Sequence, residues 1–297
     1  MSTLELITVD TPTRAVPVGR RGRALRRLLR NPLAMCGLVV VVVAVGAALL
    51  AGLVAPFTFD QTDFDNALRP PSAGHWFGTD ELGRDQFSRI LYGLRVSVMV
   101  AALSVALSMA IGVPLGLAAG FYGFLDPLVS RLTDTLLSFP FLVLAVGLAA
   151  ILGPSLTTAI VAIGVGLGVP TFIRVTRSET LRLRGLDFVA AAVAGGASDL
   201  VLLRRHILPN AVNALIVQAT VTAPAAIIGE SVLSFLGLGI RPPAPSLGVM
   251  LASSQPLFRD GPWLVVFPGV AIVVVTLALN LLGDGLRDAL DPRETRR

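Results

Sequence analysis

Six long stretches without a charged residue dominate the sequence, and each is long enough to cross the roughly 30 Å hydrocarbon core of a bilayer as a helix. They cover residues 36–54, 96–119, 135–152, 155–173, 211–229 and 261–283. Apolar residues make up 54% of the chain and charged residues only 14%, which excludes an ordinary soluble domain and a disordered chain. The pattern predicts an all-α membrane protein with six transmembrane helices. The first is expected to be retained, because no small-residue cleavage site follows it.

Arginine residues gather on one side of this predicted bundle. Seven precede the first stretch, and the loops that would share their side bring the number to eighteen of the 24 basic residues. The six others fall on the opposite side, where aspartates in the loop 56–95 offset them. Positively charged segments stay in the cytoplasm, so we expect both termini to be cytoplasmic. This placement beside membrane spans also accounts for the net charge of +5 without a nucleic-acid partner.

All of the basic residues are arginine, and the sequence contains no lysine. A P-loop requires a lysine after its glycines, so any ATP that drives this protein must be hydrolysed by another chain. The single cysteine, Cys36, excludes an internal disulfide and a cysteine metal cluster. Its place in an apolar stretch predicts that the thiol packs as a small hydrophobic group.

Prolines and glycines punctuate the predicted spans. Five of the six contain a proline, which either serves a pathway that opens and closes or is tolerated because neighbouring helices satisfy the freed carbonyls. They are Pro114, Pro140, Pro170, Pro224 and Pro268. The recurrence of Gly112, Gly116 and Gly120 on one helical face predicts close packing against another helix. Gly153 and Pro154 predict a tight hairpin between the third and fourth spans.

The longest loop on the arginine-rich side, residues 174–210, carries the strongest functional signal. Asp187 can cap a short helix that Gly195 and Gly196 end, and Ser198 can cap a second helix before Pro209. The first helix is rich in alanine, which loses little side-chain entropy when it docks against a partner. Such a helix could instead rest on the lipid surface.

This loop resembles the inner-membrane permease subunits of ATP-binding-cassette (ABC) importers. Their loop reads Glu-Ala-Ala, three residues, Gly, nine residues, Ile, any residue and Leu-Pro. Aligning Gly196 with the motif glycine places Ala190, Ala191 and Ala192 on Glu-Ala-Ala, and Leu208 and Pro209 on the closing pair. Two positions differ from the family pattern, since Ala190 replaces the glutamate and His206 replaces the isoleucine.

Three further segments are similar to the C-type permeases of the dipeptide, oligopeptide and nickel branch of that family. They read FGTDELGRD at 77–85, SFLGLGIRPP at 234–243 and GDGLRDALDP at 283–292. The resemblance extends from about residue 26 to residue 292.

The resemblance implies the type I importer permease architecture in the plasma (inner) membrane of a prokaryote. The expected organisation is an arginine-rich cytoplasmic tail (1–34), a six-helix permease domain (35–292) and a short cytoplasmic tail (293–297). The expected partners are a B-type permease, two ATPase subunits that bind ATP and Mg, and an extracytoplasmic substrate-binding protein. Di- or oligopeptides are the expected cargo; nickel transport or a self-sufficient secondary transporter are the alternatives.

The resemblance also places the ATPase contact in the loop 174–210. Its expected members are Ala190, Ala191, Ala192, Gly196, Ala197, Ser198, Asp199, Leu208 and Pro209. No catalytic site, metal site or cofactor of this chain itself is expected, because the spans hold no nucleophile with a base and no metal-ligand cluster.

Other charged residues have a structural and a functional interpretation. Glu230, near the end of the fifth span, either pairs locally or lines the transport path. Asp134 is expected to pair with Arg131 at i, i+3 spacing. In the loop 56–95, helical spacing predicts the local pairs Glu81–Arg84 and Asp85–Arg89, within a segment that is structural or receives the binding protein. His75 and Trp76 resemble an interfacial anchor.

Overall fold

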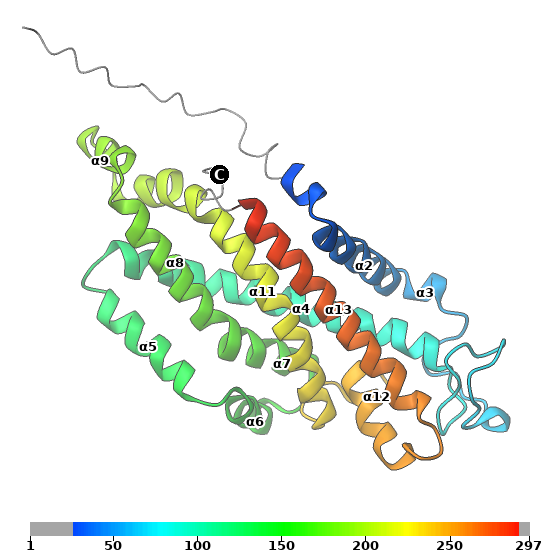
Figure 1. Ribbon diagram of the computed structural model, residues 1–297. Coiled ribbons are helices and arrows are strands. Elements are labelled where there is room, and N and C mark those ends of the chain that lie inside the picture. Colours follow the sequence, from blue (N-terminus) through cyan, green and yellow to red (C-terminus); the bar gives the residue numbers. More distant parts are fainter. Residues whose placement is uncertain (1–25, 291–297) are drawn as a thin grey trace, which may run out of the picture.

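The computed structural model describes residues 26–290, and this part of the chain is helical without a β-strand (Figure 1). The expected tails therefore lie largely outside the described residues. The helices are α2 (Pro32–Leu49), α3 (Ala51–Val54), α4 (Gln86–Phe121), α5 (Asp126–Ser138), α6 (Phe141–Leu152), α7 (Leu156–Ile163), α8 (Val169–Arg184), α9 (Asp187–Ala194), α10 (Asp199–Val201), α11 (Leu208–Phe235), α12 (Leu247–Ser254) and α13 (Trp263–Leu290). π-helical turns join α7 to α8 (Gly164–Gly168) and α10 to α11 (Leu202–Ile207).

Five of these helical segments are long and apolar enough to span a membrane, and a bent pair provides a sixth. The all-α membrane fold is therefore confirmed. The third span differs from the expectation of one helix over 135–152, because α5 and α6 meet at 89°. Phe139 and Pro140 adopt extended backbone angles at the junction. Proline disfavours helical geometry at the residue before it and supplies no N–H, which explains the break.

The other prolines disturb their helices less than Pro140 does. Pro114, Pro224 and Pro268 lie inside continuous helices, and Pro170 begins α8 directly after a π-helical turn. The turn at Gly153 is confirmed, with a φ of +79° that favours glycine, but only α6 and α7 form the arms of the hairpin.

The glycine face of α4 packs directly against α8, as its spacing predicted. A Cβ atom added to Gly112, Gly116 or Gly120 would lie 2.6 Å from the Cβ of a residue on α8. Those residues are Phe172, Thr176 and Thr180, respectively. Since no side chain fits at this distance, glycine is required for the two backbones to approach so closely. We call this contact the α4–α8 seam.

α2 and α13 run antiparallel, side by side (Figure 1). A Cβ on Gly37 would lie 2.6 Å from the carbonyl oxygen of Ala278, and one on Gly285 would lie 2.2 Å from the Cβ of Ala34. Cys36 is exposed on α2, so nothing within the described chain covers its thiol, and its packing as a small hydrophobic group stays a prediction.

The two ends of the bundle carry different structures. In Figure 1, α9 projects from the end where α2 begins and α13 finishes. The segment between α3 and α4 lies at the opposite end, beside α12 (Figure 1). We call residues 57–89 the distal cap and residues 185–207 the coupling loop.

Candidate functional site

The coupling loop has the predicted organisation of helix, glycine turn and helix. α9 closes with a Schellman motif, in which Ala197 N–H donates to the Ala192 carbonyl at 3.0 Å and Gly196 N–H to the Val193 carbonyl at 2.9 Å. Gly196 has a φ of +80°, which only glycine adopts without strain. The chain therefore reverses sharply between α9 and α10.

The side-chain caps expected for this loop are absent. Leu186 occupies the N-cap position of α9, and Asp187 is instead the first helical residue. Ser198 is the N-cap of α10 by backbone geometry, but its hydroxyl makes no capping hydrogen bond. Both helix starts are exposed, so water can satisfy their amide groups.

Apolar side chains cover the outer surface of the coupling loop. Val193 and Leu200 are 56% and 58% exposed, and Leu186 and Phe188 are about 40% exposed. Most of the predicted contact residues are exposed as well, while Ala192, Ala197 and Leu208 are half-buried. An exposed apolar patch on a short loop is typical of a docking surface.

The base of the loop is fixed to the end of α4. Leu183, Ile207 and Ala211 form a buried cluster, against which Leu117 and Phe121 of α4 pack. Arg184 Nη1 donates to the carbonyl oxygens of Gly120 and Phe121, both at 3.1 Å. These two carbonyls end α4 and lack partners within the helix, so the guanidinium satisfies them.

A second link joins α4 to α10. Tyr122, the residue that follows α4, has its pKa raised by partial desolvation and then by the charge and hydrogen bond of Asp199. Asp199 is one of the predicted ATPase contacts, and it lies near enough to the end of α4 to act on Tyr122.

Ion pairs also connect α8 to α5. Arg177 forms a bidentate pair with Asp126, and its Nη2 lies 2.7 Å from the second carboxylate oxygen. Asp134 pairs with Arg174 at 3.0 Å, so the expected pair with Arg131 is wrong. Helical spacing considers partners on the same helix only. α8 packs beside α5 and places Arg174 next to Asp134.

The end of the motif, Leu208 and Pro209, begins α11. α11 continues directly from the π-helical turn Leu202–Ile207, and Pro209 has no N–H to donate to a carbonyl of that turn. His206, which stands where the motif has isoleucine, faces Phe188 with 6.5 Å between ring centres.

Glu230 lies far from the coupling loop and is fully buried. Its two carboxylate oxygens accept hydrogen bonds from Ser97 of α4 at 2.9 Å and from Ser234 of α11 at 2.8 Å. Both partners are serine hydroxyls, and the pathway-lining role of Glu230 stays a prediction. In this conformation the carboxylate joins α4 to α11 and has no open surface.

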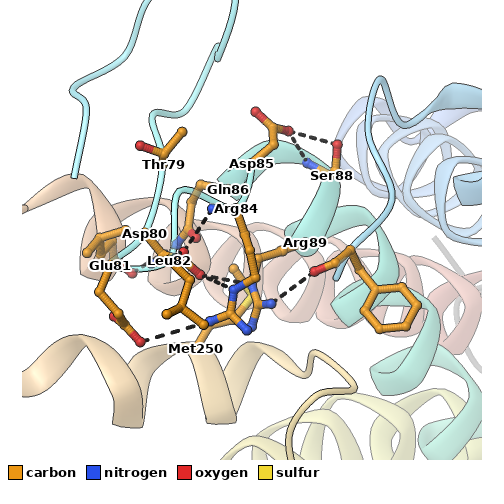
Figure 2. A network of polar contacts seen from close by, with 12 residues as sticks. Thr79, Asp80, Glu81, Leu82, Arg84, Asp85, Gln86, Ser88, Arg89 and Met250 are labelled. Carbon is orange, nitrogen blue, oxygen red and sulfur yellow. Dashed lines mark hydrogen bonds and ion pairs between the residues drawn. The ribbon is translucent and has the colours of Figure 1, made fainter. Parts of the chain in front are cut away.

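The distal cap is held together by buried charges (Figure 2). Asp80 is 6% exposed and pairs with Arg84 at 2.7 Å and with Arg89 at 3.6 Å. Arg89 also donates to the carbonyl oxygen of Phe59 at 3.0 Å. The expected Glu81–Arg84 pair is present at 3.9 Å, but Asp80 is the nearer partner of Arg84.

Asp85 does not pair with Arg89, and that expectation is wrong. It caps α4 by accepting hydrogen bonds from the N–H of Ser88 at 2.8 Å and from its hydroxyl at 2.7 Å. It also contacts His75 Nδ1 at 2.9 Å, and His75 stacks on Phe57. The Asp-x-x-Ser spacing is an N-cap signal that could have revealed this role from the sequence.

Two hydrogen bonds between the distal cap and the start of α13 were not predicted from the sequence. Trp263 Nε1 donates to the carbonyl oxygen of Thr79 at 3.2 Å, and Gln86 Nε2 donates to that of Leu264 at 3.3 Å. They attach the distal cap to the start of α13. Within residues 26–290, no group of three or more His, Cys, Asp or Glu side chains is arranged to hold a metal ion.

Comparison with protein families gives two matches. Residues 112–296 match the family described as binding-protein-dependent transport system inner membrane component. The chain belongs to this family of permeases. Residues 20–71 match the N-terminal transmembrane domain of oligopeptide transport permease C, which agrees with the C-type resemblance.

Curated relatives of this permease cover nearly all of its length. The dipeptide transport system permease protein DppC of Alkalihalophilus pseudofirmus is 44% identical over 91% of this chain and 89% of the relative. The glutathione transport system permease protein GsiD of Escherichia coli is 42% identical over 90% of this chain and 89% of the relative. A putative peptide transport system permease protein of Brucella abortus is also 42% identical, over 90% of each chain.

The fold of this permease is also found in a solved structure, an inward-facing conformation of the MetNI methionine ABC transporter. The TM-score is 0.57 at 21% identity, and the match covers 68% of this chain and 96% of the other. The likeness confirms the type I importer permease fold.

Proposed function

We propose that this permease is one of two membrane subunits of an ATP-driven importer of di- or oligopeptides. A B-type permease would complete the path, two ATPase subunits would bind ATP and Mg at the coupling-loop end, and a binding protein would deliver peptide at the distal cap. Both termini would then be cytoplasmic. Peptide cargo is supported by the names of the relatives, which include a dipeptide permease and a glutathione permease.

The observation that carries the proposal is the surface of the coupling loop. Its apolar side chains are exposed at the arginine-rich end of a chain that has no lysine for a P-loop of its own. An ATPase groove would remove Val193 and Leu200 from water. At about 25 cal/mol per Å² of apolar surface, their burial would contribute a few kcal/mol to docking.

The contacts of the loop suggest how ATPase movement would reach the membrane. The loop is continuous in the chain with α8 and α11. Arg184 and the buried cluster attach it to α4 as well. The α4–α8 seam continues this attachment toward the middle of the bundle. A push on the loop would thus move these helices together rather than bend the loop, and such a rigid element is what two-state coupling requires.

The test is purification of the chain from its native membrane in mild detergent, with mass spectrometry of the proteins that accompany it. We expect a second permease and ATPases that carry a P-loop lysine. Gly196→Trp should release the ATPases, because a bulky residue cannot adopt the left-handed turn within a groove.

Gly74→Trp is the matched control, since Gly74 is exposed in the distal cap and a Cβ there meets nothing within 4 Å. ATPases that stay bound to the Gly196→Trp chain would refute the docking site. A chain that purifies alone, under conditions in which another importer stays intact, would favour a secondary transporter.

A further inference from the structure

A deep apolar groove lies among α2, α4, α11 and α13, away from the coupling loop and the distal cap. Its volume is about 410 Å³, and thirteen of its fourteen lining residues are apolar. Thr220 is the exception, and its hydroxyl already donates to the carbonyl oxygen of Val217 at 2.8 Å. No polar group in the lining therefore needs a polar ligand.

The groove exists because small residues line it on two facing helices. Ala101 and Ala102 of α4 lie opposite Ala219 and Ala223 of α11, while Val41 of α2 helps to line it. The groove is open at the surface of the bundle, so within a membrane lipid or another helix must cover its apolar lining. At the α4–α8 seam glycines bring two backbones into contact, whereas the alanines between α4 and α11 leave space that an occupant can fill.

The volume of the groove indicates which kind of molecule fits into it. An apolar cavity of about 150 Å³ takes up benzene, so in proportion the groove accommodates on the order of sixteen carbon atoms, one acyl chain. A helix of a partner protein, roughly 10–12 Å across with its side chains, would fill the groove with about a single turn. A long partner helix is therefore a poor match.

The position of the groove along the helices gives the same answer. In α13, Leu279 and Val275 lie eight and twelve residues before Arg287, which corresponds to about 12 and 18 Å along the helix. A phospholipid headgroup at the level of Arg287 would carry its acyl chain to this depth, since half a bilayer core is about 15 Å thick.

Four arginines lie at that end of α2 and α13, where Asp284 and Asp288 flank Arg287. Arg26, Arg27 and Arg30 precede α2, and Leu28 between them packs near Gly285, two residues from Arg287. None of these four arginines pairs with a carboxylate in the part of the chain that the structure describes. We propose that the groove binds one acyl chain of an anionic membrane phospholipid whose headgroup contacts these arginines.

The test is native mass spectrometry of the purified protein, with and without incubation in vesicles of equal parts phosphatidylglycerol and phosphatidylcholine. We expect one retained phospholipid per chain, mostly phosphatidylglycerol. Ala219→Phe fills the groove and should abolish retention, whereas Ala150→Phe on the exposed face of α6 should leave it unchanged. Ala219→Val should give an intermediate loss of retained lipid. If Ala219→Phe prevents folding, Ala219→Val tests the groove in its place.

The arginines are tested separately. The double variant Arg30→Gln with Arg287→Gln should keep a lipid but lower the preference for phosphatidylglycerol about tenfold. Absence of a stoichiometric lipid on the unaltered chain would overturn the proposal. So would an Ala219→Phe chain that keeps its lipid but loses the second permease, because a partner segment would then occupy the groove. These outcomes do not depend on ATPase binding, so they stand apart from the proposed function.

Discussion

The two ends of this permease differ in the burial of their charged and apolar side chains. In the distal cap, Asp80 and Arg89 are almost fully buried and are satisfied by partners within the chain. In the coupling loop, Val193 and Leu200 are more than half exposed. The buried charges of the distal cap are satisfied within the chain, whereas these apolar side chains of the coupling loop are left open to a partner. Substitutions at the first should therefore change stability, and substitutions at the second should change assembly.

The largest effect is expected in the distal cap. Asp80→Ala would leave Arg89 buried without a carboxylate and Arg84 with only the more distant Glu81, and breaking a buried pair typically costs about 3–5 kcal/mol. Thermal unfolding in detergent should show a large loss of stability. Asp134→Ala is the control, because its pair with Arg174 is exposed and is worth about 0–1 kcal/mol. Equal effects of the two variants would mean that the charges of the distal cap are not buried as described.

A smaller loss is expected at the α4–α8 seam, which lies between the two ends. Gly116→Ala would force a methyl group to within 2.6 Å of Thr176 Cβ, and overpacking of this kind costs about 1–3 kcal/mol. Gly147→Ala on α6 meets nothing within 4 Å and should be neutral or slightly stabilising. Thermal unfolding of the two variants measures the difference. A neutral Gly116→Ala would show that the helices separate readily at the seam.

The coupling loop was more accessible to sequence reasoning than the distal cap, for a physical reason. Its signals are local, since Gly196 ends a helix and Pro209 begins one within the same short segment. The family motif adds the alanines between them.

The interactions of the distal cap join residues far apart in the chain, such as Trp263 with Thr79. The same limit applies to Asp134, because helical spacing can propose a partner on its own helix but not one on α8. The six apolar stretches predicted the spans. Hydropathy contains no information about the direction of a helix axis, so the bend at Pro140 was not predicted.

The next effect should appear in assembly rather than in stability. Leu200→Asp places a charge on the exposed apolar surface of the coupling loop, so its effect on unfolding should stay within about 0.5 kcal/mol. Docking should lose about 1–2 kcal/mol, or roughly tenfold in affinity. Titration of purified ATPase subunits onto the reconstituted permease measures this loss. The matched control is Leu53→Asn, at an 85% exposed position of α3 near the distal cap, which should leave ATPase affinity unchanged. Unaltered affinity of the Leu200→Asp chain would place the ATPase elsewhere.

The smallest effect concerns the link between the coupling loop and α4. Arg184→Gln removes the guanidinium that bonds two carbonyl oxygens at the end of α4, a loss of about 1 kcal/mol at this partly exposed position. Because the buried cluster of Leu183 and Ile207 remains, the chain should stay folded while the coupling loop opens more often. Hydrogen exchange should be about fivefold faster for the amides of α9 and α10, in line with that free energy, and unchanged in the distal cap. Arg182→Gln supplies the comparison, since Arg182 pairs with Glu179 of its own helix and, among residues 26–290, with no other carboxylate. If both variants exchange alike, the loop is held by its apolar base alone, and movement would pass to α4 through packing rather than through Arg184.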